Sequence, residues 1–221
     1  HNRCRRQRQM CIRDRTSAIL TSANLSGQDL TSVDFEKADL SGANLTGADL
    51  ENAILTGAKL ITDGSTTVNL TGATLTGAKL GKADLTGADL GKNGDVKTNL
   101  VGADLNGAIL IGADLGDALF TGANLEKANL DNTTLTNTVF SSTTEGVVTA
   151  ANLTGAILTS ANLNGRDLTG VDFEKADLSG ANLTGADLEN ATLIGAKLIT
   201  DGTNVVKLMG ATLTGAKLSK A

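Results

Sequence analysis

A leucine or phenylalanine recurs at every fifth residue along most of this chain, and that period limits what the chain can fold into. The run ADLSGANLTGADLEN (residues 38–52) shows the repeating unit: Ala, then Asp or Asn, then the apolar residue, then two more residues that are often Ser or Thr followed by Gly. An α-helix turns about 100° per residue, so leucines five apart would drift around its surface by about 140° at each step. A helix therefore cannot gather these leucines into one core.

Extended backbone accommodates the unit, because residues two apart point to the same side of a strand. The alanine and the apolar residue then face inward, and the Asp or Asn between them faces water. The next two residues must turn a corner, and glycine supplies the positive φ that a type II turn requires at its third residue. A corner in every unit winds the chain into a coil, and four sides close best around a core one leucine wide.

These residues resemble the pentapeptide-repeat family, whose consensus is similar to A-(D/N)-L-x-x, over nearly all of residues 16–221. The resemblance implies an all-β fold, a right-handed quadrilateral parallel β-helix that forms a solenoid. The apolar centres, taken four to a coil, predict about nine coils. Backbone hydrogen bonds are expected to stack the coils at the usual strand separation of ~4.8 Å.

Four segments break the period and are predicted to leave the coil as loops: residues 63–67 (DGSTT), 93–97 (NGDVK), 143–150 (TTEGVVTA) and 201–205 (DGTNV). A larger duplication supports this interpretation, because residues 17–83 align without a gap with residues 155–221 and differ at 12 of 67 positions. Once the three intervening loops are removed, the offset of 138 residues corresponds to six whole coils. The two copies are therefore predicted to present the same residues on the same faces.

The loop assignment also predicts which side chains are neighbours. If residues 63–67 leave the coil, Lys59 lies between Asp39 and Asp84 on one face, whereas otherwise Lys79 takes the place of Asp84. Opposite charges on neighbouring strands stabilise by ~0.2–1 kcal/mol and like charges destabilise, which favours the looped register. Phe120 and Phe140 are one coil apart and are predicted to stack inside the same face.

The chain divides into a leader, residues 1–15, and the repeat region, residues 16–221. The leader lacks the period and carries six arginines against one acid, about +5, so the rest of the chain is acidic at about −10. We interpret the leader as a non-native or disordered basic segment, and a native basic tail or nucleic-acid-binding arm is the alternative. The last unit stops in mid-repeat, so the chain is expected to be a fragment of a longer protein.

No catalytic, cofactor-binding or metal-binding residue is predicted, and the chain is expected not to be an enzyme. His1 is the only histidine and lies in the leader with both cysteines, Cys4 and Cys11, so the repeats offer no Ser-His-Asp, Cys-His or zinc arrangement. No phosphate-binding loop motif is present. The outward carboxylates are expected to stay solvated, without the raised pKa of a general acid.

Two functions remain open from the sequence. The first is a non-catalytic structural or protein-interaction module, a rigid rod with an acidic surface and an unknown protein partner. The acidic charge and scarce aromatics argue against direct nucleic-acid binding, no apolar run suits a membrane, and no small-molecule substrate or cofactor is expected. The family resemblance implies the alternative, a DNA-mimicking ligand of DNA gyrase of the quinolone-resistance kind, although the Phe- and Cys-rich repeats and C-terminal dimerisation module of those relatives are missing here. A bacterial source is expected; the compartment stays open, with the cytoplasm favoured.

Overall fold

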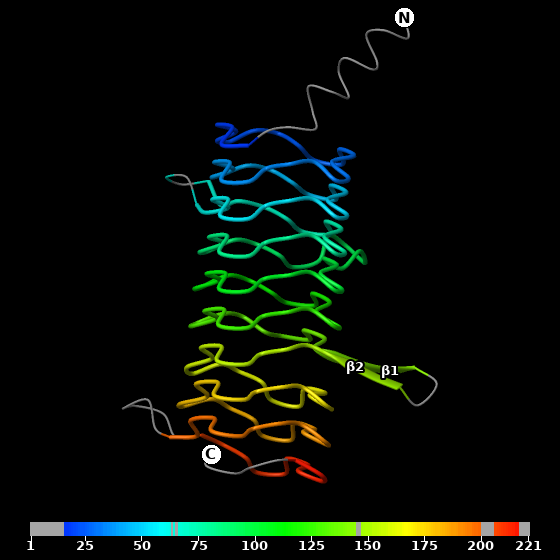
Figure 1. Ribbon diagram of the computed structural model, residues 1–221, viewed down its shortest axis with the longest axis vertical. Coiled ribbons are helices and arrows are strands. Elements are labelled where there is room, and N and C mark those ends of the chain that lie inside the picture. Colours follow the sequence, from blue (N-terminus) through cyan, green and yellow to red (C-terminus); the bar gives the residue numbers. More distant parts are fainter. Residues whose placement is uncertain (1–15, 63, 65, 145–146, 200–205, 217–221) are drawn as a thin grey trace, which may run out of the picture.

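The computed structural model describes residues 16–62, 64, 66–144, 147–199 and 206–216. Figure 1 shows an elongated stack of coils through which the chain advances from one end to the other. The leader, residues 1–15, and the predicted loop at 201–205 lie outside the described residues, so the interpretations placed on them stay predictions.

Four ladders of parallel bridges run along the stack, and each ladder joins the outward Asp, Asn or equivalent residues of one side, here named faces A to D in chain order. Face A consists of Ile19, Asp39, Lys59, Asp84, Ile109, Asn129, Ile157, Asp177 and Lys197. Face B consists of Asn24, Asn44, Asn69, Asp89, Asp114 and Thr134, followed by Asn162, Asn182 and Lys207. Face C consists of Asp29, Asp49, Thr74, Asn99, Leu119 and Val139, followed by Asp167, Asp187 and Thr212. Face D consists of Asp34, Ile54, Lys79, Asp104, Asn124, Asn152, Asp172 and Thr192.

Each rung of a ladder is a bridge centred on one residue, and each corner is a tight turn. On face A, the Leu40 amide donates to the Lys59 carbonyl (2.8 Å), and the Lys59 amide donates to the Ala38 carbonyl (2.9 Å). At the next corner, the Ala43 amide donates to the Leu40 carbonyl (3.0 Å), with Gly42 at φ +66°. Glycine thus occupies the third position of the turn with positive φ, as the sequence predicted.

The core is a column of inward leucines and alanines that are almost all completely buried between the first and last described coils. The Phe120 and Phe140 rings lie inside face C with centroids 5.8 Å apart and planes at 21°. The predicted stacking of these two rings is confirmed.

The looped register is confirmed as well. Lys59 bridges Asp39 on one side and Asp84 on the other, while Lys79 lies on face D between Ile54 and Asp104. An unbroken run of six bridges joins Ile19 to Ile157, the equivalent residue of the second copy, so the two copies do share their faces. The number of coils in the whole chain and the hand of the coil stay predictions.

A β-hairpin stands where the sequence predicted a loop over 143–150. Strand β1 (Ser141–Thr144) pairs antiparallel with β2 (Val147–Ala150), and Figure 1 shows the pair projecting sideways from the stack. The hairpin begins two residues before the predicted loop, because Ser141 and Ser142 pair with Ala150 and Thr149. The β-branched residues of β2 suit a strand, which the break in the period alone did not reveal.

The segment 93–97 leaves the coil between faces B and C. Asn93 and Val96 exchange both backbone hydrogen bonds, so the chain reverses within four residues. The return to the coil is secured by Thr98, whose buried hydroxyl donates to the Gly91 carbonyl (2.6 Å) and accepts the Gly72 amide (2.9 Å). A threonine replaces the usual inward alanine here because the loop leaves backbone groups that need a partner.

Candidate functional site: the outward faces of the coil

The outward Asp and Asn side chains close the corners of the coil as well as facing water. The Asp39 carboxylate accepts the Ser41 amide (3.1 Å) and the Ser41 hydroxyl (2.6 Å) on the same oxygen, Oδ1. Asn44 does the same with the amide and hydroxyl of Thr46 (3.0 and 2.7 Å). Sequence reasoning explained these residues by solvation alone. The missed signal was the choice of the short Asp and Asn over Glu and Lys, which marks a side chain that bonds its own backbone two residues on.

These hydrogen bonds lower the pKa of several outward carboxyls. The Thr31 hydroxyl, and then its amide, lower the pKa of Asp29, and the Ser41 hydroxyl and amide do the same for Asp39. Burial raises the pKa of Asp177, but the Ser179 hydroxyl and amide and the Lys197 ammonium together outweigh it and lower the pKa. These groups are therefore held ionised, the opposite of what a general acid at neutral pH requires.

Face C differs from the other faces in its charge. Face C with the corner residues that follow its rungs carries six acids and no lysine, and Arg166 lies immediately before the Asp167 rung; the acids are Asp29, Asp49, Glu51, Asp167, Asp187 and Glu189. Face D with its corners also carries six acids, but five lysines accompany them: Lys37, Lys79, Lys82, Lys127 and Lys175. The negative charge of the described rod is thus concentrated on one side.

The middle of face C is apolar and is bordered by the two projections. Leu119 and Val139 form neighbouring rungs between the two acidic groups, in place of Asp or Asn. The 93–97 turn leaves the coil at one edge of the face and the hairpin at the other edge, and both carry exposed valines: Val96 is 59% exposed and Val147 is 65% exposed. Ser141 fixes the base of the hairpin, since its hydroxyl donates to the Thr169 carbonyl (2.6 Å).

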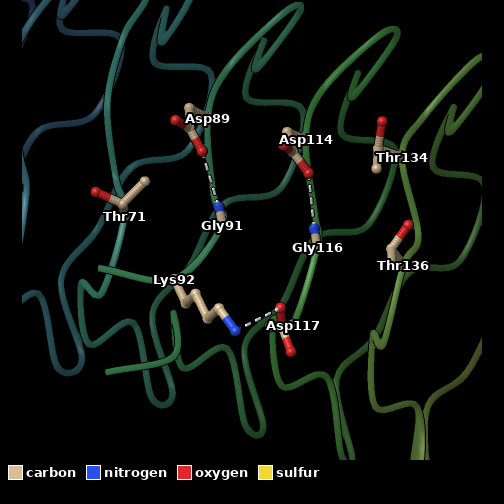
Figure 2. Close-up of a pocket in the computed structure, with 9 residues that line it drawn as sticks. All are labelled: Thr71, Asp89, Gly91, Lys92, Asp114, Gly116, Asp117, Thr134 and Thr136. Carbon is tan, nitrogen blue, oxygen red and sulfur yellow. Dashed lines mark hydrogen bonds and ion pairs between the residues drawn. The ribbon is translucent and has the colours of Figure 1, made fainter. Parts of the chain in front are cut away.

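Face B carries a shallow hollow of about 410 Å³, shown in Figure 2. Gly91 and Gly116 line it at corner positions where Ser or Thr usually stands, so the lack of two side chains contributes to the hollow. Asp89 and Asp114 cap these glycine amides (3.0 and 2.9 Å).

At the rim of the hollow, Lys92 Nζ lies 3.5 Å from Asp117 Oδ2. In the part of the chain that the structure describes, no group of three or more His, Cys, Asp or Glu is arranged to hold a metal ion. Within that same part, no helix is long and apolar enough to cross a membrane.

The ladders, the buried leucine–alanine core and the corners that recur every five residues define a solenoid of pentapeptide repeats. The family model for pentapeptide repeats matches the chain in eight copies, over residues 18–60, 68–91, 98–137, 149–175 and 172–199. The chain belongs to the pentapeptide-repeat family. The first three gaps between the matched segments include the 63–67 and 93–97 segments and most of the hairpin.

Several solved pentapeptide-repeat structures are similar to this chain. HetL from the cyanobacterium Nostoc sp. strain PCC 7120, described as involved in heterocyst differentiation regulation, is 32% identical over 100% of this chain and 93% of its own, with a TM-score of 0.44. QnrB1, described as a plasmid-mediated fluoroquinolone resistance protein, is 17% identical over 92% of this chain and 84% of its own, with a TM-score of 0.45. Rfr23 from the cyanobacterium Cyanothece 51142 is 26% identical over 66% of this chain and 97% of its own, with a TM-score of 0.23. No curated protein sequence matches the chain significantly.

Proposed function

We propose that this chain is a non-catalytic protein-interaction module, a rigid, right-handed, nine-coil rod that docks a cationic protein partner on face C. The observation that carries the proposal is the unbalanced charge of that face beside the nearly balanced charge of face D. Charge segregated to one side of a rod steers a basic partner to that side.

The rod suits docking because its faces are held rigidly. Every described coil is hydrogen-bonded to its neighbours along the ladders, and away from the end coils nearly all side chains that point inward are buried. A preformed flat face loses little conformational entropy when a partner binds. The partner is expected to match the face, with basic residues near the two acidic groups and apolar residues opposite Leu119 and Val139.

The gyrase-ligand alternative makes a different demand on the surface. A mimic of duplex DNA needs negative charge on more than one side, whereas the lysines of face D and its corner neutralise that side of the rod. The distribution of charge therefore favours docking on one face. Inhibition of gyrase supercoiling, or protection of gyrase from a quinolone, by the rod at sub-micromolar concentration would favour the alternative.

The docking test compares two variants that change the net charge equally. The face C variant carries D29N, D49N, E51Q, D167N, D187N and E189Q, and the face D variant carries D34N, E36Q, D104N, E126Q, D172N and E174Q. Asparagine is compatible with the fold at these outward positions, because Asn24 and Asn44 occupy the equivalent positions on face B. Each accepts a hydrogen bond from the backbone amide two residues on, as the aspartates do. Circular dichroism and thermal melting check that both variants fold.

Immobilised wild-type rod and both variants are then exposed to a bacterial extract, and the bound proteins are crosslinked and mapped by mass spectrometry. We expect a basic protein that binds the wild type and the face D variant, is lost from the face C variant, and leaves crosslinks along face C. Its binding is expected to weaken with added salt, because exposed charges are screened within about 8 Å at physiological ionic strength. Equal binding by the two variants, or loss from both, would contradict docking on face C.

A further inference from the structure

We propose that Asn93 is a site of selective spontaneous deamidation, where a neutral amide of the rod is converted into a carboxylate. The chain contains three Asn-Gly pairs, Asn93–Gly94, Asn106–Gly107 and Asn164–Gly165. Asn-Gly is the dipeptide most open to this reaction, because glycine has no Cβ to shield its backbone nitrogen. The structure gives the three pairs very different freedom.

The reaction needs only the chain and water. The Gly94 nitrogen attacks Cγ of Asn93, a bond forms between them, the bond from Cγ to the side-chain nitrogen breaks, and that nitrogen leaves as ammonia with the proton from Gly94. Water then opens the five-membered imide at either carbonyl and leaves aspartate or isoaspartate. The attacking nitrogen must lose its hydrogen, so any hydrogen bond that holds the N–H group protects the pair.

The two corner pairs are protected in this way. The Gly107 amide donates to the Glu126 carbonyl (2.8 Å), and the Gly165 amide donates to the Thr184 carbonyl (2.9 Å). Both are rungs between neighbouring coils, so neither nitrogen can react until the coils separate locally. The Asn106 side chain is held as well, since its Nδ2 donates to Glu126 Oε2 (3.2 Å).

The loop pair lacks this protection. Asn93 and Val96 close the turn through their own amides and carbonyls (2.8 and 3.1 Å), and neither of these two hydrogen bonds uses the Gly94 amide. No hydrogen bond from that amide is made to any residue that the structure describes. Asn93 and Gly94 are both exposed, and apart from Gly94 and its two chain neighbours no residue has an atom within 4 Å of the position where a Cβ would stand on Gly94. The attacking nitrogen is therefore open to water and base.

The product changes the rod at a defined place. A new carboxylate beside Asp95 adds negative charge to the turn that borders face C. Isoaspartate also inserts a methylene group into the main chain, which lengthens the backbone that Asn93 and Val96 now pair across. The conversion is irreversible, so the fraction of chains deamidated at Asn93 increases with the time since synthesis.

The test follows all three pairs in one molecule. The purified full chain is aged at mildly alkaline pH, digested at acid pH to suppress new imide formation, and mapped by mass spectrometry for the mass gain of deamidation. We expect Asn93 to react at least about tenfold faster than Asn106 or Asn164, the ratio that a local opening cost of ~1.4 kcal/mol gives. In denaturant the three rates are expected to converge, because the corner hydrogen bonds are gone.

Two outcomes would overturn the proposal. One is equal or faster reaction at Asn106 or Asn164 in the folded chain. The other is an unreacted Asn93 in the folded chain while the denatured chain reacts at all three pairs. The Asn93→Ser variant shows whether the fast deamidation comes from Asn93. It should abolish the fast mass gain and leave the deamidation rates of Asn106 and Asn164 and the thermal midpoint unchanged.

Discussion

Replacing Phe140 by alanine tests the core where two aromatic rings meet, the one such place in the part of the chain that the structure describes. Phe120 and Phe140 are both fully buried, with centroids 5.8 Å apart. The coil around them cannot easily collapse onto a cavity, because the Phe120 amide donates to the Val139 carbonyl (2.7 Å) and the Ala151 amide to the Phe140 carbonyl (2.8 Å). We therefore expect Phe140→Ala to lower the free energy of unfolding by the full ~3–5 kcal/mol of a buried phenylalanine.

Leucine variants separate the ring contact from the loss of volume. Leucine fills this inward position on most sides of the coil, so Phe120→Leu and Phe140→Leu should fold and cost less than alanine. A double-mutant cycle of the two is expected to give a coupling energy of ~0.5–1.5 kcal/mol, the contribution of a stacked pair beyond its buried area. Phe173→Leu is the control, since the inward neighbours of Phe173 on face D are Leu153 and Leu193.

Urea unfolding followed by circular dichroism measures these free energies, with coincident transitions by a second probe as the check on two-state behaviour. A repeat rod can also open locally, so hydrogen exchange near residues 120 and 140 should report the same ranking. A coupling energy within about 0.3 kcal/mol of zero would refute the contribution of ring stacking. A loss under ~1 kcal/mol for Phe140→Ala would refute the rigidity assigned to the coil.

Three further changes test the loops and corners. Thr98→Val should cost ~0.5–1.5 kcal/mol in urea unfolding because it removes two buried hydrogen bonds and leaves the Gly72 amide only its longer bond to the Gly91 carbonyl (3.3 Å), whereas Thr98→Ser should be nearly neutral. Ser41→Ala should bring the pKa of Asp39 back toward its ordinary value. The stabilisation that comes from the lowered pKa of Asp39 is complete above pH ~4 and is lost as pH falls through the pKa of the folded state. The thermal midpoint of the variant should therefore fall less steeply in acid than that of the wild type. Gly77→Ala should melt only slightly lower than Gly102→Ala, since both glycines have φ +65° and the Asn52 oxygen, 2.6 Å from the new Cβ at Gly77, belongs to an exposed side chain that can rotate away. A large difference in melting would show that the Asn52 side chain is held in place.

The sequence was sufficient for the coil because every unit repeats the same local physics. The spacing of leucines indicated which residues point inward and where each corner falls, and glycine or another residue takes positive φ there. The register between Asp39, Lys59 and Asp84 followed from charge and from the loop at 63–67, and the ladders bear it out. No contact distant in sequence had to be guessed, since each coil touches only its neighbours.

What the sequence did not predict depends on departures from the repeat. The period marks where it breaks but not what replaces it, so the hairpin of β1 and β2 was expected only as a loop. The hollow on face B arises in part because Gly91 and Gly116 lie side by side on neighbouring rungs, which becomes visible only when the chain is folded into register. The charge of face C was likewise hidden, because its acids are scattered through the chain and a net charge does not say on which side they gather.

The charge of face C can be traced to a rule for the corners. Along the corner between faces D and A, lysine and glycine alternate from coil to coil: Lys37, Gly57, Lys82, Gly107, Lys127, Gly155, Lys175 and Gly195. Each of these lysines has a positive φ of 56–58°, and its Cγ lies 3.5–3.8 Å from where a Cβ would stand on the glycine of the next coil. The lysine stem thus covers the glycine. A second lysine there would crowd the stem and set two ammonium groups one strand spacing, ~4.8 Å, apart.

Alternation therefore gives this corner as many lysines as it can hold, and some of them pair directly with the acids beside them, such as Lys37 with Glu36 (2.8 Å) and Lys175 with Glu174 (2.7 Å). In the corner between faces C and D, the described residues at the positive-φ position include no lysine and are only Ser, Asn or Gly: Ser32, Asn52, Gly77, Gly102, Gly122, Gly170, Asn190 and Gly215. The acids of face C consequently have no cation beside them along this corner. The choice of corner residue, made for backbone and packing reasons, thereby decides which side of the rod a basic partner meets.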